Sequence, residues 1–84
     1  MRSVALNTGG HTNMHYKGYE VAPAAQPLAS GLFAANLVIQ DEVSLQKRAY
    51  VFNALDYFFE SDLAVAYAAR WARMWIDNRR LPHA

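Results

Sequence analysis

Histidine is the residue type in this chain whose spacing most resembles a metal site. His11 and His15 are four residues apart, which on a helix would place two imidazoles on one face as half of a metal site. A third ligand does not accompany them, and the Gly, Asn and Thr residues around them disfavour a rigid helix. The sequence therefore favours a protein that binds no metal or other cofactor.

Hydroxyl and carboxylate groups also lack the partners that catalysis needs. The serines near ordered structure fall at a predicted turn, a loop and a helix N-terminus: Ser30, Ser44 and Ser61. The patterned region holds no histidine to act as their base. The carboxylate pairs fall in a predicted loop and at a helix start: Asp41 with Glu42, and Glu60 with Asp62. We predict a protein without enzymatic activity.

Size and composition indicate one small domain. The chain has 84 residues, no cysteine and a formal net charge of +1. Without disulfides the expected compartment is the cytoplasm, and the near-neutral charge is not typical of a dedicated nucleic-acid-binding protein. Polar residues interrupt every apolar stretch before the roughly 18 residues of a membrane span, and we expect neither a membrane partner nor a signal peptide.

Three segments follow from changes in pattern. Residues 1–15 are predicted to be a disordered tail, residues 16–80 a single β-β-β-α domain, and residues 81–84 a C-terminal tail. Met14 directly precedes the patterned region, so translation could begin at Met1 or at Met14.

Alternating apolar residues predict three strands. The first covers residues 16–23, after which Pro23 and Pro27 are expected to end regular pairing and to keep the linker at the periphery. The second covers residues 32–40, with one face toward the core: Phe33, Ala35, Leu37 and Ile39. The third covers residues 48–55, and its pattern leaves open whether Tyr50 and Phe52 or Val51 and Leu55 face the core.

Residues 61–80 predict one amphipathic helix. Ser61 is a suitable N-cap, and Pro82 prevents extension beyond the end. The expected buried stripe is Ala64, Tyr67, Ala68, Trp71, Met74 and Trp75. The expected solvated face is Asp62, Arg70, Arg73, Asp77 and Arg80, with Arg73 paired to Asp77.

The predicted architecture is α+β: a three-stranded antiparallel meander with the C-terminal helix packed on one face. The other face stays uncovered and would present Ala34, Val38 and either Val51 or Tyr50. The third strand should form an edge of the sheet with little protection beyond Lys47 and Arg48, unless the linker or the tail folds over it.

A sequence pattern supports the same fold. It runs from Tyr16-Lys17-Gly18-Tyr19 through a proline to Gly31-Leu32-Phe33, then Phe52-x-Ala54-x-Asp56, and ends in the helix from Ala64 to Asp77. In this order the chain resembles a group of small uncharacterised bacterial β-β-β-α proteins, some of which are described as HlyU-like regulators. The resemblance covers about residues 16–80 and implies the fold more than an activity.

Two functions fit these observations. The first is a small interaction domain that binds an unknown protein partner or forms a homodimer, with a candidate interface of Val38, Tyr50, Val51, Phe52 and Trp75. The alternative is a regulator that contacts nucleic acid through Lys47, Arg48, Arg70, Arg73, Arg79 and Arg80. Trp71 and Trp75, four residues apart, could form a stacking platform for bases, although such a stripe is more often core.

Overall fold

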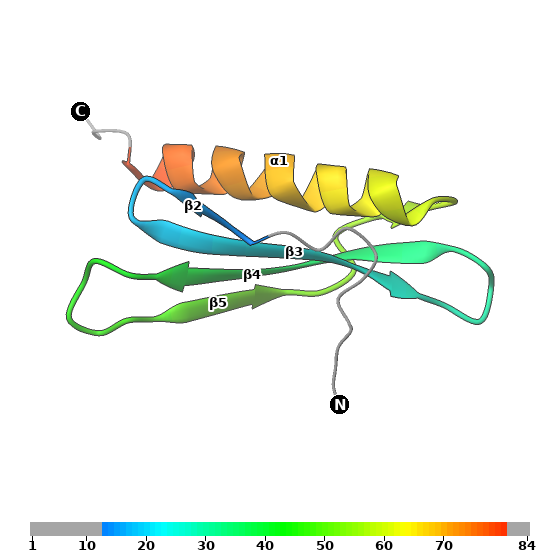
Figure 1. Cartoon of the computed structure of the whole chain (residues 1–84), viewed down its shortest axis with the longest axis horizontal. Coiled ribbons are helices and arrows are strands. Elements are labelled where there is room, and N and C mark those ends of the chain that lie inside the picture. Colours follow the sequence, from blue (N-terminus) through cyan, green and yellow to red (C-terminus); the bar gives the residue numbers. More distant parts are fainter. Residues whose placement is uncertain (1–12, 81–84) are drawn as a thin grey trace.

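The computed structural model describes residues 13–80, apart from the side chain of Arg80. An antiparallel sheet is covered on one face by a single helix, α1 (Ser61–Arg80) (Figure 1). The strands are β2 (Met14–Tyr16), β3 (Tyr19–Pro27), β4 (Phe33–Asp41), β5 (Ala49–Phe52) and β6 (Tyr57–Phe58). They pair in the order β2-β3-β4-β5, with β6 also on β4. The α+β class and the C-terminal helix are confirmed, whereas the prediction of three strands is wrong because the sheet has five strands within the described residues alone.

The first additional strand results from a tight turn inside the predicted first strand. Lys17 and Gly18 have φ angles of 51° and 89°, and positive values at both central residues are typical of a two-residue type I′ hairpin turn. The turn lets β2 pair with the start of β3, with Tyr16 opposite Tyr19. A Cβ atom at Gly18 would lie 2.6 Å from Cγ2 of Val43, so glycine also permits close packing against the β4–β5 loop.

The predicted tail is therefore too long. Met14 and His15 belong to β2, and His15 lies opposite Glu20. His15 thus has strand geometry instead of the helical geometry that the proposed pair of imidazoles required. His11 and the rest of residues 1–12 lie outside the described part of the chain, as does the predicted C-terminal tail.

Both prolines lie inside β3, contrary to the prediction that they end regular pairing. The reason is that the backbone hydrogen bonds of successive residues in a strand point alternately to the two neighbouring strands. Asp41 donates its N–H to the carbonyl of Arg48, so odd-numbered residues of β4 bond toward β5 and even-numbered residues toward β3. Pro23 and Pro27 stand opposite odd-numbered residues of β4. Their nitrogens consequently point away from β4, where no ladder donor is needed.

The predicted third strand is interrupted. β5 ends at Phe52, and Ala54 has a φ of 55°, which bends the chain out of the ladder. The side-chain Oδ1 of Asn36 accepts a hydrogen bond of 2.8 Å from the Ala54 N–H and so holds this bend against β4. The chain then rejoins β4 as β6, where Phe58 stands opposite Phe33. The strand expected over residues 48–55 is thus shortened to β5, and β6 is an additional strand beyond that range.

The core lies between α1 and the inner face of the sheet. Its largest fully buried side chains are Val21, Leu37, Ile39 and Ile76. Alanines spaced four residues apart form the contact row of the helix, and each has no exposed surface: Ala64, Ala68 and Ala72. Because alanine side chains are short, the helix axis lies close to β3 and β4, the two strands that α1 contacts most.

This row differs from the predicted buried stripe at several positions. Met74 is 64% exposed, whereas Ala72 and Ile76 are fully buried. The helix also includes Ser61 as its first residue, and the carbonyl of Glu60 accepts the N–H of Ala64, which places Glu60 at the cap position predicted for Ser61. Tyr67, Trp71 and Trp75 are partly buried against the core, as the pattern predicted.

The facing of the third strand, which the sequence left open, is now defined. Tyr50 and Phe52 pack against the core, and Val51 lies on the uncovered face opposite Val38. Val51 is 61% exposed and Val38 is 36% exposed, whereas Ala34 on the same face is only 2% exposed. Within the described residues, no helix is both long enough and apolar enough to cross a membrane.

Candidate protein interface at the β5 edge

The outer side of β5, here called the β5 edge, presents unpaired positions of the ladder. Because the Arg48 carbonyl accepts from β4, the even-numbered residues of β5 bond inward, and the N–H and C=O groups of Ala49 and Val51 point outward. The linker of residues 23–31 does not cover this edge, since it forms β3 and the β3–β4 turn on the other side of β4. The prediction that the third strand lies at an edge is confirmed for the described part of the sheet.

An aromatic cluster lies between this edge and the helix. We call it the aromatic flank, and it consists of Tyr50, Phe52, Trp71 and Trp75. Phe52 lies 4.7 Å from Trp71 and 5.6 Å from Trp75 between ring centroids, and Tyr50 lies 4.9 Å from Trp75. The rings are tilted or edge-on to each other, the arrangements that aromatic pairs prefer. The two tryptophans therefore pack against the core through these contacts, while each remains only half-buried.

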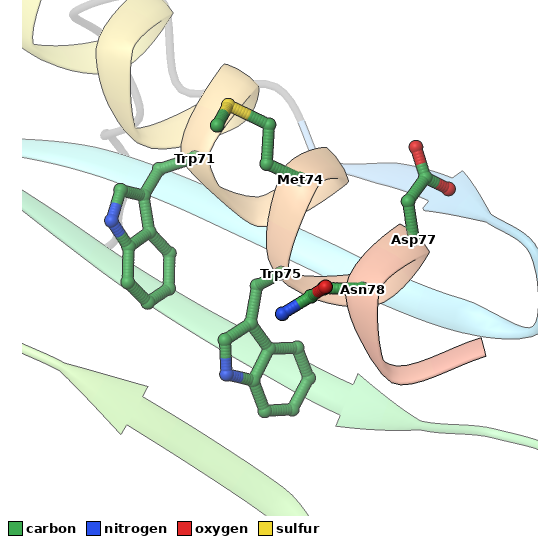
Figure 2. A pocket seen from close by; sticks show the side chains of 5 residues that line it. All are labelled: Trp71, Met74, Trp75, Asp77 and Asn78. Atoms are coloured by element: carbon green, nitrogen blue, oxygen red, sulfur yellow. The ribbon is translucent and has the colours of Figure 1, made fainter. Parts of the chain in front are cut away.

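A surface groove of about 460 Å³ runs along the helix beside this flank (Figure 2). Its lining comes from the second half of α1: Trp71, Met74, Trp75, Asp77 and Asn78. Figure 2 shows both indole rings directed toward the sheet while Met74 projects from the outer side of the helix. Since one helix supplies the whole lining, the groove is a shallow apolar surface and not an enclosed substrate pocket.

Arg79 closes the end of the aromatic flank. Its guanidinium carbon lies 4.7 Å from the ring centre of Trp75 and 5.2 Å from that of Tyr50. A hydrogen bond with Tyr19, followed by the charge effects of Tyr50, Tyr19 and Asp41, raises the pKa of Arg79 above its ordinary value. This predicted phosphate contact is thus engaged with aromatic rings, a role that the sequence analysis did not anticipate.

The remaining basic candidates do not form one surface. Lys47 and Arg48 are exposed at the end of the β4–β5 loop, where the Lys47 ammonium is 3.3 Å from the Glu42 carbonyl oxygen. Arg70 and Arg73 are exposed in the middle of the helix, away from that loop (Figure 1). The side chain of Arg80, the sixth candidate, lies outside the described part.

A separate polar cluster joins the first hairpin to the helix. The Tyr16 hydroxyl donates to Asp77 with distances of 3.0 and 2.9 Å to the two carboxylate oxygens, and the Lys17 ammonium lies 2.7 Å from Oδ1. These hydrogen bonds, that of Lys17 first, lower the pKa of Asp77, and the same contact raises the pKa of Lys17. The ion pair of Asp77 is thus with Lys17 and not, as the sequence predicted, with Arg73, and Arg73 acts on Asp77 only through its charge, which also lowers the pKa of Asp77.

This cluster should make the hairpin sensitive to acid. Because the folded-state pKa of Asp77 is lowered, its contribution is complete above the ordinary aspartate pKa and is lost as pH falls through the folded value. We expect the β2 amides to exchange faster at about pH 3 than at about pH 6 after correction for intrinsic rates. In Asp77→Asn this additional acid response should disappear. An unchanged response in Asp77→Asn, matched to an Asp62→Asn control, would contradict the assignment.

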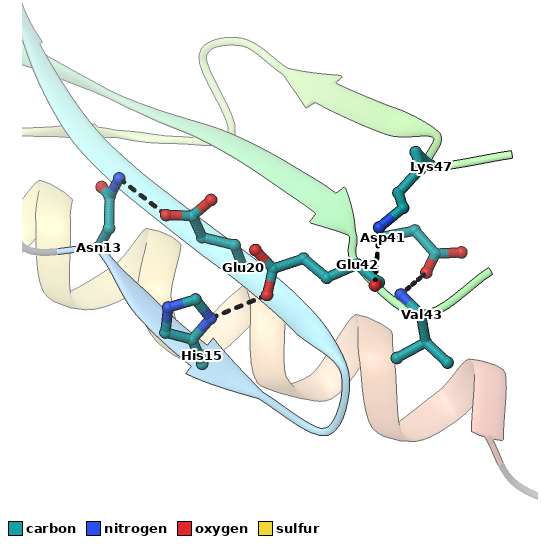
Figure 3. A network of polar contacts seen from close by, with 7 residues as sticks. All are labelled: Asn13, His15, Glu20, Asp41, Glu42, Val43 and Lys47. Carbon is teal, nitrogen blue, oxygen red and sulfur yellow. Dashed lines mark hydrogen bonds and ion pairs between the residues drawn. The ribbon is translucent and has the colours of Figure 1, made fainter. Parts of the chain in front are cut away.

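The β4–β5 loop is held by a second network, drawn in Figure 3. His15 Nδ1 lies 2.9 Å from Oε1 of Glu42. Asp41 Oδ1 accepts the N–H groups of Val43 and Ser44 at 2.9 and 3.0 Å, and these bonds, that of Ser44 first, lower the pKa of Asp41. Asp41 therefore organises the backbone of this loop, as expected of an acidic residue at a turn, whereas the Glu42 carboxylate connects the loop to β2.

Over residues 13–80, no group of three His, Cys, Asp or Glu side chains is placed to hold a metal ion. Ser30 has a turn role, since its Oγ lies 3.3 Å from the N–H of Leu32 in the β3–β4 loop. Of the surfaces described, the β5 edge with its aromatic flank is the one that combines open backbone groups with apolar side chains.

Comparisons of this chain with protein families, with curated proteins and with solved structures find no significant match.

Proposed function

We propose that this protein is a small non-enzymatic interaction domain that binds a protein chain at the β5 edge. The observation that carries the proposal is the outward direction of the Ala49 and Val51 backbone groups, flanked by apolar side chains on both faces. An added strand would pair with these groups. Its side chains would meet Val38 and Val51 on one face and the aromatic flank on the other.

The physical argument is that open edges are normally protected. Natural sheets shield them with charges, prolines, bulges or covering segments, because unpaired donors and acceptors attract other strands. On β3 the two prolines serve this purpose, but β5 carries alanine, tyrosine, valine and phenylalanine over Ala49–Phe52. Val51 is 61% exposed at the centre of this edge. An unprotected, apolar edge is consistent with a surface that a partner covers.

A photo-crosslinking residue at position 51, introduced in cells, tests the proposal. The matched control is the same residue at position 66, which is exposed on the outer side of α1. We expect specific products from position 51 and none from position 66. Position 51 cannot carry both the crosslinking residue and a proline, so a second pair of proteins carries the crosslinker at position 38, with and without Val51→Pro. The proline removes the outward N–H of residue 51 and leaves the hydrogen bonds of β5 to β4 intact.

The outcomes separate the candidate functions. Products at positions 51 and 38 that Val51→Pro abolishes would support the β5 edge as the binding site. Identical products from positions 51 and 66 would contradict it. The alternative of nucleic-acid binding through Lys47 and Arg48 is tested by titrating duplex DNA, because phosphate contacts weaken steeply with salt while an apolar strand interface changes little.

A further inference from the structure

We propose that the partner at the β5 edge is a second copy of this chain, paired antiparallel across a two-fold axis at Val51. This inference rests on the proposed function, since it names the occupant of the same edge. It is carried by three properties of the described residues: the direction of the backbone groups, the side chains on each face, and the charges at the two ends of the edge.

The backbone groups fit a self-paired register. With the axis at Val51, Val51 of one copy stands opposite Val51 of the other, and Ala49 stands opposite Asn53. Ala49 and Val51 are the β5 residues whose N–H and C=O groups point outward. The N–H of each Val51 can therefore donate a hydrogen bond to the carbonyl of its counterpart, so that the two valines form a hydrogen-bonded pair of an antiparallel ladder.

The side chains fit the same register on both faces. On the helix side, Tyr50 of one copy would lie beside Phe52 of the other, and the two aromatic flanks would meet across the axis. On the uncovered side, the two Val51 side chains would meet, each next to its own Val38. Such aromatic and β-branched neighbours are among the cross-strand pairs that stabilise sheets.

The charges at the ends of the edge favour the antiparallel direction. Lys47 and Arg48 precede β5, whereas Asp56 and Glu60 follow it, and all four side chains are exposed. Antiparallel pairing brings the basic end of one copy to the acidic end of the other, at both ends of the joined strands. Parallel pairing would place like charges together, which electrostatics disfavours.

The short edge predicts a reversible dimer. β5 has four residues, so its pairing alone buries much less than the roughly 1,000 Å² of a stable interface. The aromatic flanks and the charged ends must supply the rest. Sedimentation velocity of the full chain from micromolar to near-millimolar concentration should show a monomer–dimer equilibrium that Val51→Pro shifts to monomer.

A charge exchange tests the geometry. Arg48→Glu places a carboxylate at the end of β5 that faces the acidic end of the other copy, which includes Asp56, and Asp56→Lys places an ammonium at the end that faces Arg48 of the other copy. Each variant alone should dimerise roughly tenfold more weakly than the original chain, because two attractive contacts become repulsive. In an equimolar mixture both contacts become attractive again, and dimers containing one copy of each variant should form with nearly the original affinity.

The results have distinct meanings. Rescue in the mixture supports the antiparallel two-fold dimer, and a mixture that stays as weak as its components overturns it. A wild-type chain that is monomeric at every concentration overturns the second copy as partner, while crosslinks from position 51 to a different protein would still uphold the proposed function. Circular dichroism checks folding, since Asp56 Oδ1 accepts the N–H of Tyr57; if Asp56→Lys unfolds, the exposed Glu60→Lys replaces it.

Discussion

Replacing Leu37 with alanine is expected to lower the free energy of unfolding by about 2–5 kcal/mol, the range for removing a large aliphatic side chain from a core. Leu37 is 1% exposed and lies in the middle of β4, beneath the alanine row of the helix. Small domains often have only about 5 kcal/mol of stability in total, so this variant should be largely unfolded or close to it. Urea unfolding followed by tryptophan fluorescence measures the change.

The neighbouring residue provides the matched control. Val38 lies in the same strand, but its side chain is on the uncovered face and is 36% exposed. Val38→Ala should therefore cost about 1 kcal/mol or less in the monomer. Equal losses from Leu37→Ala and Val38→Ala would show that the core is not confined to the helix side of the sheet.

A second large effect is expected from enlarging the contact row of the helix. Ala68 has no exposed surface, and a leucine there must push α1 away from β3 and β4. Overpacking of this kind costs about 1–3 kcal/mol and can cost more where the backbone has to move. Because Leu and Ala have similar helix propensities, the loss measures packing and not helix formation.

Ala66→Leu is the control that separates the effect of overpacking from the effect of replacing an alanine of this helix with leucine. It adds the same atoms to the same helix at an exposed position, and its midpoint in a thermal or urea transition should lie near that of the original chain. If Ala68→Leu were equally well tolerated, the close approach of helix and sheet described for this fold would be wrong.

The helix and the central strand could be predicted from sequence because each has a long, regular pattern. The predicted range of residues 61–80 coincides with α1, and the alternation of residues 33–39 correctly identified Ala35, Leu37 and Ile39 as core. Within the helix, however, hydrophobicity alone selected Met74, whereas the geometry of contact with a sheet selected the smaller Ala72. Where a helix packs closely on a sheet, the positions spaced four residues apart along its contact row favour small side chains over large apolar ones.

The elements that the sequence did not predict depend on backbone conformation at single residues or on hydrogen bonds between residues far apart in the chain. A lysine at φ 51° is not the usual residue of a type I′ turn, so the sequence does not reveal the turn, and the prediction assigns Met14 and His15 to the tail and starts the first strand at Tyr16. Pro23 could be placed inside β3 only after the direction of each ladder bond was known. The bend at Ala54 likewise depends on a hydrogen bond to Asn36, a residue 18 positions earlier.

The candidate site was predicted in part. The position of the third strand at an edge follows from strand order, but its facing does not follow from a sequence in which both sides are apolar. Charge patterning along one helix does not reveal the contacts that its charged residues make with aromatic rings and with other elements. Examples are the contacts of Arg79 with Trp75 and Tyr50 and the hydrogen bond of Tyr16 to Asp77, which join residues separated by 4 to 61 positions.

The prolines of β3 have a further consequence for how this protein can assemble. A sheet polymerises into fibres when both of its sides accept strands, because every added unit then offers a fresh side to the next one. Here the outward-pointing nitrogens of Pro23 and Pro27 carry no hydrogen, and β2 pairs with only three residues of β3. In the described part of the chain, growth by strand addition is thus favoured on one side alone. In the proposed dimer, joining two molecules would occupy that side, and the assembly would be complete at two units.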